Sequence, residues 1–223
     1  MNGSQLYELV TALLDGEEIS TSLFVTLANE KKLQRELRRD WQVLKAKANI
    51  GTVTPSTTPD STFSLPERCL RPIKNTLHSR AVVLLDSNGR KVGAADEILF
   101  ERQYDHADAA GKFFIDHSHR TLHFTGRPPV PENRTAMLFY IKGSPAITYE
   151  ENGGVGWESF ANTSVGIDFS PLLAFDIAMT QKGSVDYDDL NARMVQYIGK
   201  DADDLEYAMN KWDDTMKLSA LQV

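Results

Sequence analysis

Three closely spaced histidines are the first residues in this chain whose types and spacing could do chemistry. His117, His119 and His123 lie in the stretch FFIDHSHRTLHFTG (113–126) and make up three of the five histidines among 223 residues. Zinc binds imidazole nitrogen, and His-x-His is a spacing it accepts. A catalytic zinc site also needs a further ligand, supporting hydrogen bonds and a pocket, and Asp116 is the nearby carboxylate. Because strand-like segments flank the histidines, we interpret the stretch as a hairpin with a histidine-rich turn and predict no metal.

Other catalytic signatures are missing from the sequence. It contains no Gly-rich phosphate loop, no G-x-S-x-G turn and no H-E-x-x-H motif. The acidic pairs at 188–189, 203–204 and 213–214 are adjacent, and neighbours on a helix point about 100° apart, so they do not form an acid/base pair. Cys69 has no evident activating partner. We therefore predict that the protein is not an enzyme and has no catalytic, cofactor-binding or metal-binding residues. A metal-dependent hydrolase using the three histidines is kept as an alternative.

Composition narrows the class of protein further. The formal net charge is −7, which disfavours tight, non-specific binding to DNA phosphates. One cysteine cannot form an internal disulfide. No apolar run approaches the roughly 20 residues that span a membrane, and the sequence MNGSQLYELV does not have the pattern of a signal peptide. The sequence thus predicts a globular protein that does not enter a membrane.

The first part of the chain has helical periodicity. Ser4 can cap a helix with apolar residues on one face, and a second helix is predicted from near Ser20 to Ala48. This second segment carries a basic run, consisting of Lys31, Lys32, Arg35, Arg38 and Arg39. The run is typical of a solvated helix face, and it is also compatible with an interface for an acidic partner.

The middle of the chain changes to strand periodicity. Residues 49–67 are rich in Thr, Ser and Pro and are interpreted as a linker or exposed arm. Asn88-Gly89 predicts a hairpin turn, FFID and TLHFT a strand pair, and TAMLFYIKG a further strand. Helix then returns, with Ser170 as N-cap, Pro171 in the first turn and an almost wholly apolar continuation that predicts burial. A last helix is predicted over 202–221.

The order of these elements predicts the architecture. We expect an α+β fold in which both chain ends form one helical bundle and a small antiparallel β-domain is inserted between them. The predicted boundaries are 1–48 and 167–223 for the helical domain, and 49–166 for the β-rich domain with its arm.

Four stretches, taken in order, resemble a known family. They are QLYELVTALLDGEEISTSLFVTLANEKKLQRELRRDW, LPERCLRP, KFFIDHSHRTLHFTG and FSPLLAFDIAM…DDLNARM…LEYAMNKWDDTMKLSAL. Together they make the chain similar to the head–tail adaptors of tailed bacteriophages, over nearly its whole length. The resemblance implies a virion protein of the neck, assembled in the host cytoplasm. It also implies a ring, usually of twelve copies, that docks on the portal protein, extends the DNA channel and meets the next neck or tail protein.

The resemblance and the charge pattern together suggest interface residues. A ring that closes head-to-tail needs two different complementary patches on each copy. The last 56 residues hold eleven acidic and five basic side chains, so they can complement the basic run. Asp186, Asp188 and Asp189 are the predicted acidic contacts. In this family the C-terminal segment often meets the portal, which here assigns Lys217, Leu218, Leu221 and Val223 to that contact.

Other functions stay open at this point. A stopper or tail-terminator protein would serve the same neck, but such proteins are typically smaller and mainly β. A binding module for a peptide or a sugar could use the aromatic residues of the β-region, although strand alternation predicts that most of them are buried.

Overall fold

The computed structural model describes residues 3–38, 41–58, 60–74, 80–102, 110–126, 129–149, 155–156, 170–182 and 187–221. The chain divides into two compact units. Unit 1 combines Met1–Leu44 with Gly143–Val223, and unit 2 is Lys45–Lys142. Residues far apart in the sequence therefore build unit 1, whereas unit 2 is one continuous segment.

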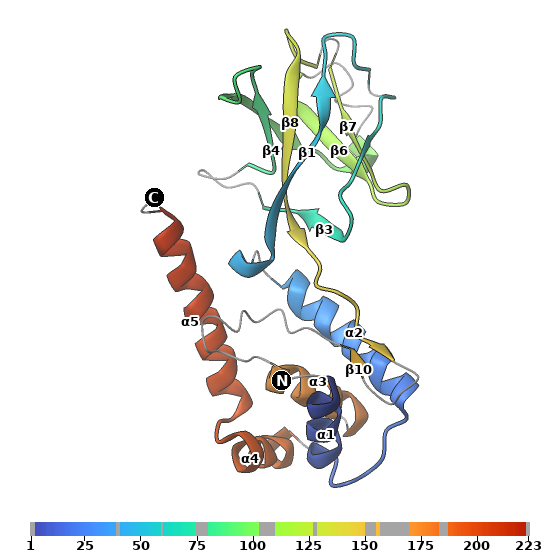
Figure 1. Ribbon diagram of the computed structural model, residues 1–223, viewed down its shortest axis with the longest axis vertical. Coiled ribbons are helices and arrows are strands. Elements are labelled where there is room, and N and C mark those ends of the chain that lie inside the picture. Colours follow the sequence, from blue (N-terminus) through green and yellow to red (C-terminus); the bar gives the residue numbers. More distant parts are fainter. Residues whose placement is uncertain are drawn as a thin grey trace. The chain divides into compact units, whose positions relative to one another are not determined.

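Unit 1 is mainly helical (Figure 1). Its elements are α1 (Gly3–Leu13), α2 (Thr21–Leu37), the 3-10 helix η1 (Gln42–Leu44), β9 (Thr148–Tyr149), β10 (Val155–Gly156), α3 (Ser170–Lys182), α4 (Tyr187–Ile198) and α5 (Ala202–Leu221). The short strands β9 and β10 pair antiparallel.

Helix α3 forms the centre of unit 1. It contacts α1, α2, α4 and α5, and eight of its thirteen residues, from Ser170 to Ala178 with the exception of Asp176, are buried. The helices that contact α3 also carry fully buried apolar side chains, for example Leu6 and Val10 of α1 and Phe24 of α2. A helix with no extended polar face is stable only when it is covered on all sides, which explains why both chain ends are needed here.

Unit 2 is a mixed sheet of eight strands. They are β1 (Lys45–Val53), β2 (Phe63–Ser64), β3 (Cys69–Pro72), β4 (Val82–Leu85), β5 (Lys91–Glu97), β6 (Lys112–Asp116), β7 (Thr121–Phe124) and β8 (Arg134–Lys142), with the 3-10 helix η2 (Phe100–Arg102) after β5. The order is β1-β8-β4-β5-β6-β7-β2, and β3 also pairs with β8. The pair β5–β6 is parallel, and the other strand pairs within the sheet are antiparallel.

The two ends of this sheet approach each other. Strands β1 and β2, at opposite ends of the strand order, are in contact. At this meeting point, which we call the seam, a Cβ placed on Gly51 would lie 3.0 Å from the ring of Phe63. The sheet is therefore nearly closed and barrel-like, with Phe113, Leu122, Phe124 and Leu138 among its fully buried side chains.

Several local predictions are confirmed. Ser20 caps α2, and its hydroxyl oxygen accepts a hydrogen bond from the backbone N–H of Leu23. Helix α3 begins at Ser170-Pro171. The turn at Asn88-Gly89 joins the antiparallel strands β4 and β5. The predicted strand pair is β6–β7, the further strand is β8, and the last helix is α5.

The predicted fold class is wrong. The chain is a mixed α/β protein in which the sheet has eight strands, is nearly closed and contains a parallel pair, so it is not a small antiparallel insertion beside a helical bundle. The error has a local cause. Residues 45–53 were assigned partly to a helix ending at Ala48 and partly to an exposed arm, yet they form β1, which pairs along its length with β8. Helix α4 was not predicted either.

Candidate functional site

Helix α2 carries the basic run and presents it on distinct faces. At about 100° per residue, Asn29, Lys32 and Glu36 fall on one side of the helix. Lys31, Arg35 and Arg38 fall on another side. A third, exposed side contains apolar residues, which are Leu23, Leu33 and Leu37. The positive charges of the run therefore do not form one uniform surface.

One face of α2 holds the extended segment before β9. The side-chain amide of Asn29 donates to the carbonyl of Ile147 (2.8 Å) and accepts from its backbone N–H (2.9 Å). The ammonium group of Lys32 donates to the carbonyl (3.1 Å) and the hydroxyl (3.0 Å) of Ser144. The carboxylate of Glu36 accepts from the backbone N–H of Ser144 (3.1 Å) and from its hydroxyl. Lys32 and Glu36 are 5% and 1% exposed, so these groups stabilise the fold of unit 1.

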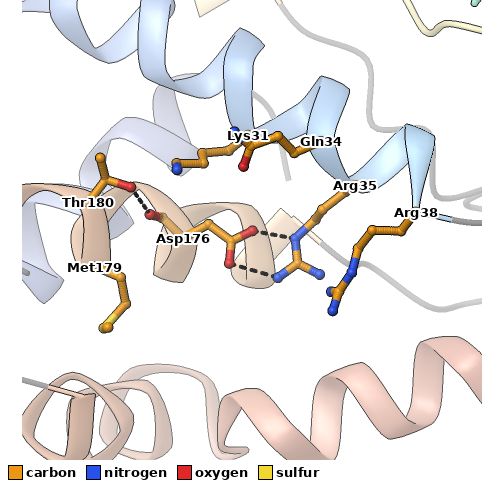
Figure 2. A pocket seen from close by; sticks show the side chains of 7 residues that line it. All are labelled: Lys31, Gln34, Arg35, Arg38, Asp176, Met179 and Thr180. Atoms are coloured by element: carbon orange, nitrogen blue, oxygen red, sulfur yellow. Dashed lines mark hydrogen bonds and ion pairs between the residues drawn. The ribbon is translucent and has the colours of Figure 1, made fainter. Parts of the chain in front are cut away.

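The neighbouring face of α2 lines a hollow of about 470 Å³ against α3. We call this hollow the basic pocket (Figure 2), and it is lined by Lys31, Gln34, Arg35, Arg38, Asp176, Met179 and Thr180. Arg35 faces Asp176 with its planar fork: Nε and a terminal nitrogen donate to the two carboxylate oxygens at 2.5 and 2.9 Å. Such a bidentate pair fixes the orientation of both groups. The lining has three cations and one carboxylate, so it retains positive charge.

Arg38 lies at the boundary between the basic pocket and a second hollow, beside α5, of about 210 Å³. Its guanidinium is 2.8 Å from the carboxylate of Glu206, and the two side chains are 55% and 37% exposed. Ion pairs with this exposure contribute little to stability. Trp41 supports the end of α2, because its indole N–H donates to the carbonyl of Arg35 at 2.8 Å.

This arrangement can bind anions. An ammonium group (Lys31) and a guanidinium group (Arg38) border the basic pocket, and the hydroxyl group of Thr180 and the amide of Gln34 supply further polar groups. A carboxylate with an adjoining apolar group suits such a surface, because the side chain of Met179 forms part of the wall. The lining contains no cysteine, histidine or serine that could act as a nucleophile or base.

The predicted interface residues are thus found in different environments. Lys31 and Arg38 border the basic pocket, whereas Lys32 and Arg35 are buried and bind partners within unit 1. Asp188 and Asp189 are exposed on α4, and Asp189 accepts a hydrogen bond from Arg193 at 3.0 Å. The positions Lys217, Leu218 and Leu221 belong to α5. Arg39, Asp186 and Val223 lie outside the described residues.

The three histidines do not converge. His119 Nδ1 is 2.6 Å from Asp116 Oδ2, while His123 stacks on Phe114 with ring centroids 4.8 Å apart. His117 lines a separate hollow of about 360 Å³ beside Glu97, and burial raises the pKa of that carboxyl. Across the described part of the chain, no group of three or more His, Cys, Asp or Glu residues could hold a metal ion.

Asp116 organises the histidine-rich turn. Its Oδ1 accepts hydrogen bonds from the backbone N–H of Ser118 (2.9 Å), the hydroxyl of Ser118 (2.5 Å) and the backbone N–H of His119 (3.2 Å). These hydrogen bonds, with Ser118 contributing most, hold the pKa of Asp116 well below its ordinary value. The turn is therefore ordered by a carboxylate that stays ionised.

Exposed apolar side chains on unit 1 were missed by the sequence reasoning. Leu23, Leu33 and Leu37 are 42%, 41% and 41% exposed and lie within about 80° of arc on α2. Val195 and Tyr197 of α4 and Tyr207 of α5 are at least half exposed. The signal for α2 was available, because the three leucines share a face that the buried Phe24, Leu27 and Ala28 do not occupy. A row of exposed leucines on one side of a helix is typical of an interaction surface.

No protein-family model and no curated protein matches this sequence. Among the helices that the structure describes, none has both the length and the apolar character needed to cross a membrane.

Proposed function

We propose that this chain is a structural head–tail adaptor of a tailed bacteriophage. In this role, copies of the chain form a ring, of twelve by analogy with the family it resembles, and the ring docks on the portal protein. It extends the DNA channel and provides the platform for the next neck or tail protein. The protein then belongs to the virion, between capsid and tail, and is not an enzyme.

The observation that carries this proposal is the surface of α2. Leu23, Leu33 and Leu37 are exposed on one side of α2 and the basic pocket occupies another side, although a chain that functioned alone would gain by burying such a row of leucines or replacing it with polar residues. The sequence resemblance described above supplies the kind of assembly. The net charge of −7 also supports a channel wall through which DNA passes without tight binding.

Electron microscopy of the purified chain mixed with the portal protein of the same phage tests the proposal. The expected result is an added ring of density at the narrow end of the portal, together with a matching increase in the mass of the complex. A portal from an unrelated phage serves as the control and should gain no density. If the chain leaves its own portal bare, the adaptor role is refuted, and a later neck component such as a stopper or terminator becomes the better assignment.

A further inference from the structure

The cations of α2 divide into those used inside unit 1 and those available to a partner. Lys32 binds Ser144, and Arg35 binds Asp176, and both cations are almost fully buried. Lys31 is only half-buried, and Arg38 has a side chain that is 55% exposed and that pairs, among the described residues, with the half-buried Glu206. The available positive charge of the basic pocket therefore comes from two side chains on its rim.

An apolar side chain lies beside these two cations, because Met179 forms part of the pocket wall. The exposed Leu33 and Leu37 lie on a different side of α2, about 100–160° around the helix from Lys31 and Arg38. A partner that matches the basic pocket carries carboxylates and an apolar side chain on one face. The charge would orient the partner, and contact with Met179 would add burial of apolar surface.

Helix α4 of the same chain has such a face. Asp188 and Val195 are exposed and seven residues apart, so they lie on the same side of the helix. Asp203, exposed at the start of α5, is joined to the start of α4 because its carboxylate accepts a hydrogen bond from the hydroxyl of Tyr187 at 3.1 Å. The pKa of Tyr187 is raised by burial, by this hydrogen bond and by the nearby charges of Asp203, Asp201 and Asp188. We call Asp188, Asp203 and Val195 the acidic face.

We propose that the basic pocket of one copy receives the acidic face of the next copy, so that Lys31 and Arg38 meet Asp188 and Asp203 while Met179 meets Val195. This inference rests on the ring assembly of the proposed function and names its subunit contact. The two patches share no residue, so the contact is head-to-tail and can generate a ring. Charge complementarity on a single chain is the reason for choosing a second copy over another acidic protein.

Charge reversal in both directions tests the contact. The first variant is Lys31→Glu with Arg38→Glu, and the second is Asp188→Lys with Asp203→Lys. Arg35 is left unchanged because it anchors α3. The matched control is Arg90→Glu with Lys91→Glu, a double reversal of exposed residues in unit 2. Self-association of the full chain is measured by sedimentation velocity at low salt, and thermal unfolding verifies that each variant is folded.

Each reversed variant should self-associate about 100-fold more weakly than the wild type, because like charges then oppose each other at the contact. The control should behave as the wild type. An equal mixture of the two reversed variants should associate again, since each variant then offers the charge that the other needs. If a reversal lowers the unfolding temperature, Lys31→Gln with Arg38→Gln replaces the first variant, and an association about tenfold weaker is expected.

Several outcomes would overturn this inference: a wild-type chain that stays monomeric, reversals that leave association intact, or a mixture that fails to restore it. Loss of portal binding by the first variant without loss of self-association would assign the basic pocket to the portal instead. Portal binding of the wild type is measured in parallel. A ring that forms on the portal despite both reversals refutes this contact alone, whereas charge-dependent self-association without any portal binding refutes only the adaptor role.

Discussion

The ion pair between Arg35 and Asp176 provides a quantitative test of how unit 1 is held together. The two side chains are 8% and 27% exposed and joined by two charge-assisted hydrogen bonds. Breaking a fully buried pair by removing one partner costs about 3–5 kcal/mol, because the other charge stays buried. Since water reaches Asp176, we expect Asp176→Ala to lower the free energy of unfolding by about 2–3 kcal/mol. Arg35→Lys, which cannot form the fork, should cost about half as much.

Urea unfolding followed by tryptophan fluorescence measures these changes, since Trp41 is hydrogen-bonded to the carbonyl of Arg35. Replacing both partners by apolar residues, Arg35→Met with Asp176→Leu, should recover most of the loss and leave a net cost below about 1 kcal/mol. Arg80→Ala is the control, because it breaks an ion pair that is 41% and 45% exposed and should cost less than about 0.5 kcal/mol. A loss for Asp176→Ala as small as this control would refute the reasoning.

Three further predictions concern unit 2. The lowered pKa of Asp116 stabilises the folded state at pH values above 3.8, the pKa of this carboxyl in the unfolded chain, and this stability is lost as the pH falls through the folded pKa. In an acid titration, the free energy of unfolding of Asp116→Ala should therefore fall less steeply with decreasing pH than that of the wild type. Parallel curves for the two proteins would contradict this. Burial raises the pKa of the Cys69 thiol to about 11. A thiol reagent at pH 8 should therefore modify Cys69 far more slowly in the folded chain than in the urea-unfolded chain. Equal rates of modification would show that the thiol is accessible in the folded chain. Gly51 has a φ of +137° and closely approaches Phe63, so Gly51→Ala should lower the free energy of unfolding by about 1–3 kcal/mol. The control Gly93→Ala, whose added Cβ would have its nearest neighbour at 3.8 Å, should leave the free energy of unfolding almost unchanged. Similar costs for the two variants would argue against strain at the seam.

Local signals in the sequence were sufficient for much of the secondary structure. The N-cap Ser20, the Ser170-Pro171 pair at the start of α3 and the turn at Asn88-Gly89 act over a few residues, so their effects could be recognised without the fold. Helix α4 was also accessible, because Leu190 and Met194 have helical spacing and Gly199 ends the helix with a positive φ.

The strand β1 shows where local signals were insufficient. Lys45, Lys47 and Asn49 are exposed and alternate with half-buried neighbours, which is strand periodicity, but the preceding helical pattern obscured it. The decisive interaction is the long pairing with β8, in which Lys45 is paired with Ile141, 96 residues later in the chain. Fold class depended on that pairing, and so it could not be deduced from neighbouring residues.

The basic pocket itself was not predicted, for the same reason. The charges of α2 were evident in the sequence, but the partners that remove Lys32 and Arg35 from the surface are 112 and 141 residues away in the chain. Only the folded arrangement separates the two structural cations from Lys31 and Arg38.

The seam between β1 and β2 has a consequence for solubility. A strand at an open sheet edge presents unpaired N–H and C=O groups that can template pairing with another chain and start aggregation. In unit 2 the two terminal strands of the order are turned toward each other, and a glycine lets the ring of Phe63 cover the backbone there. Near-closure therefore protects backbone edges that would otherwise be open to pairing with another chain.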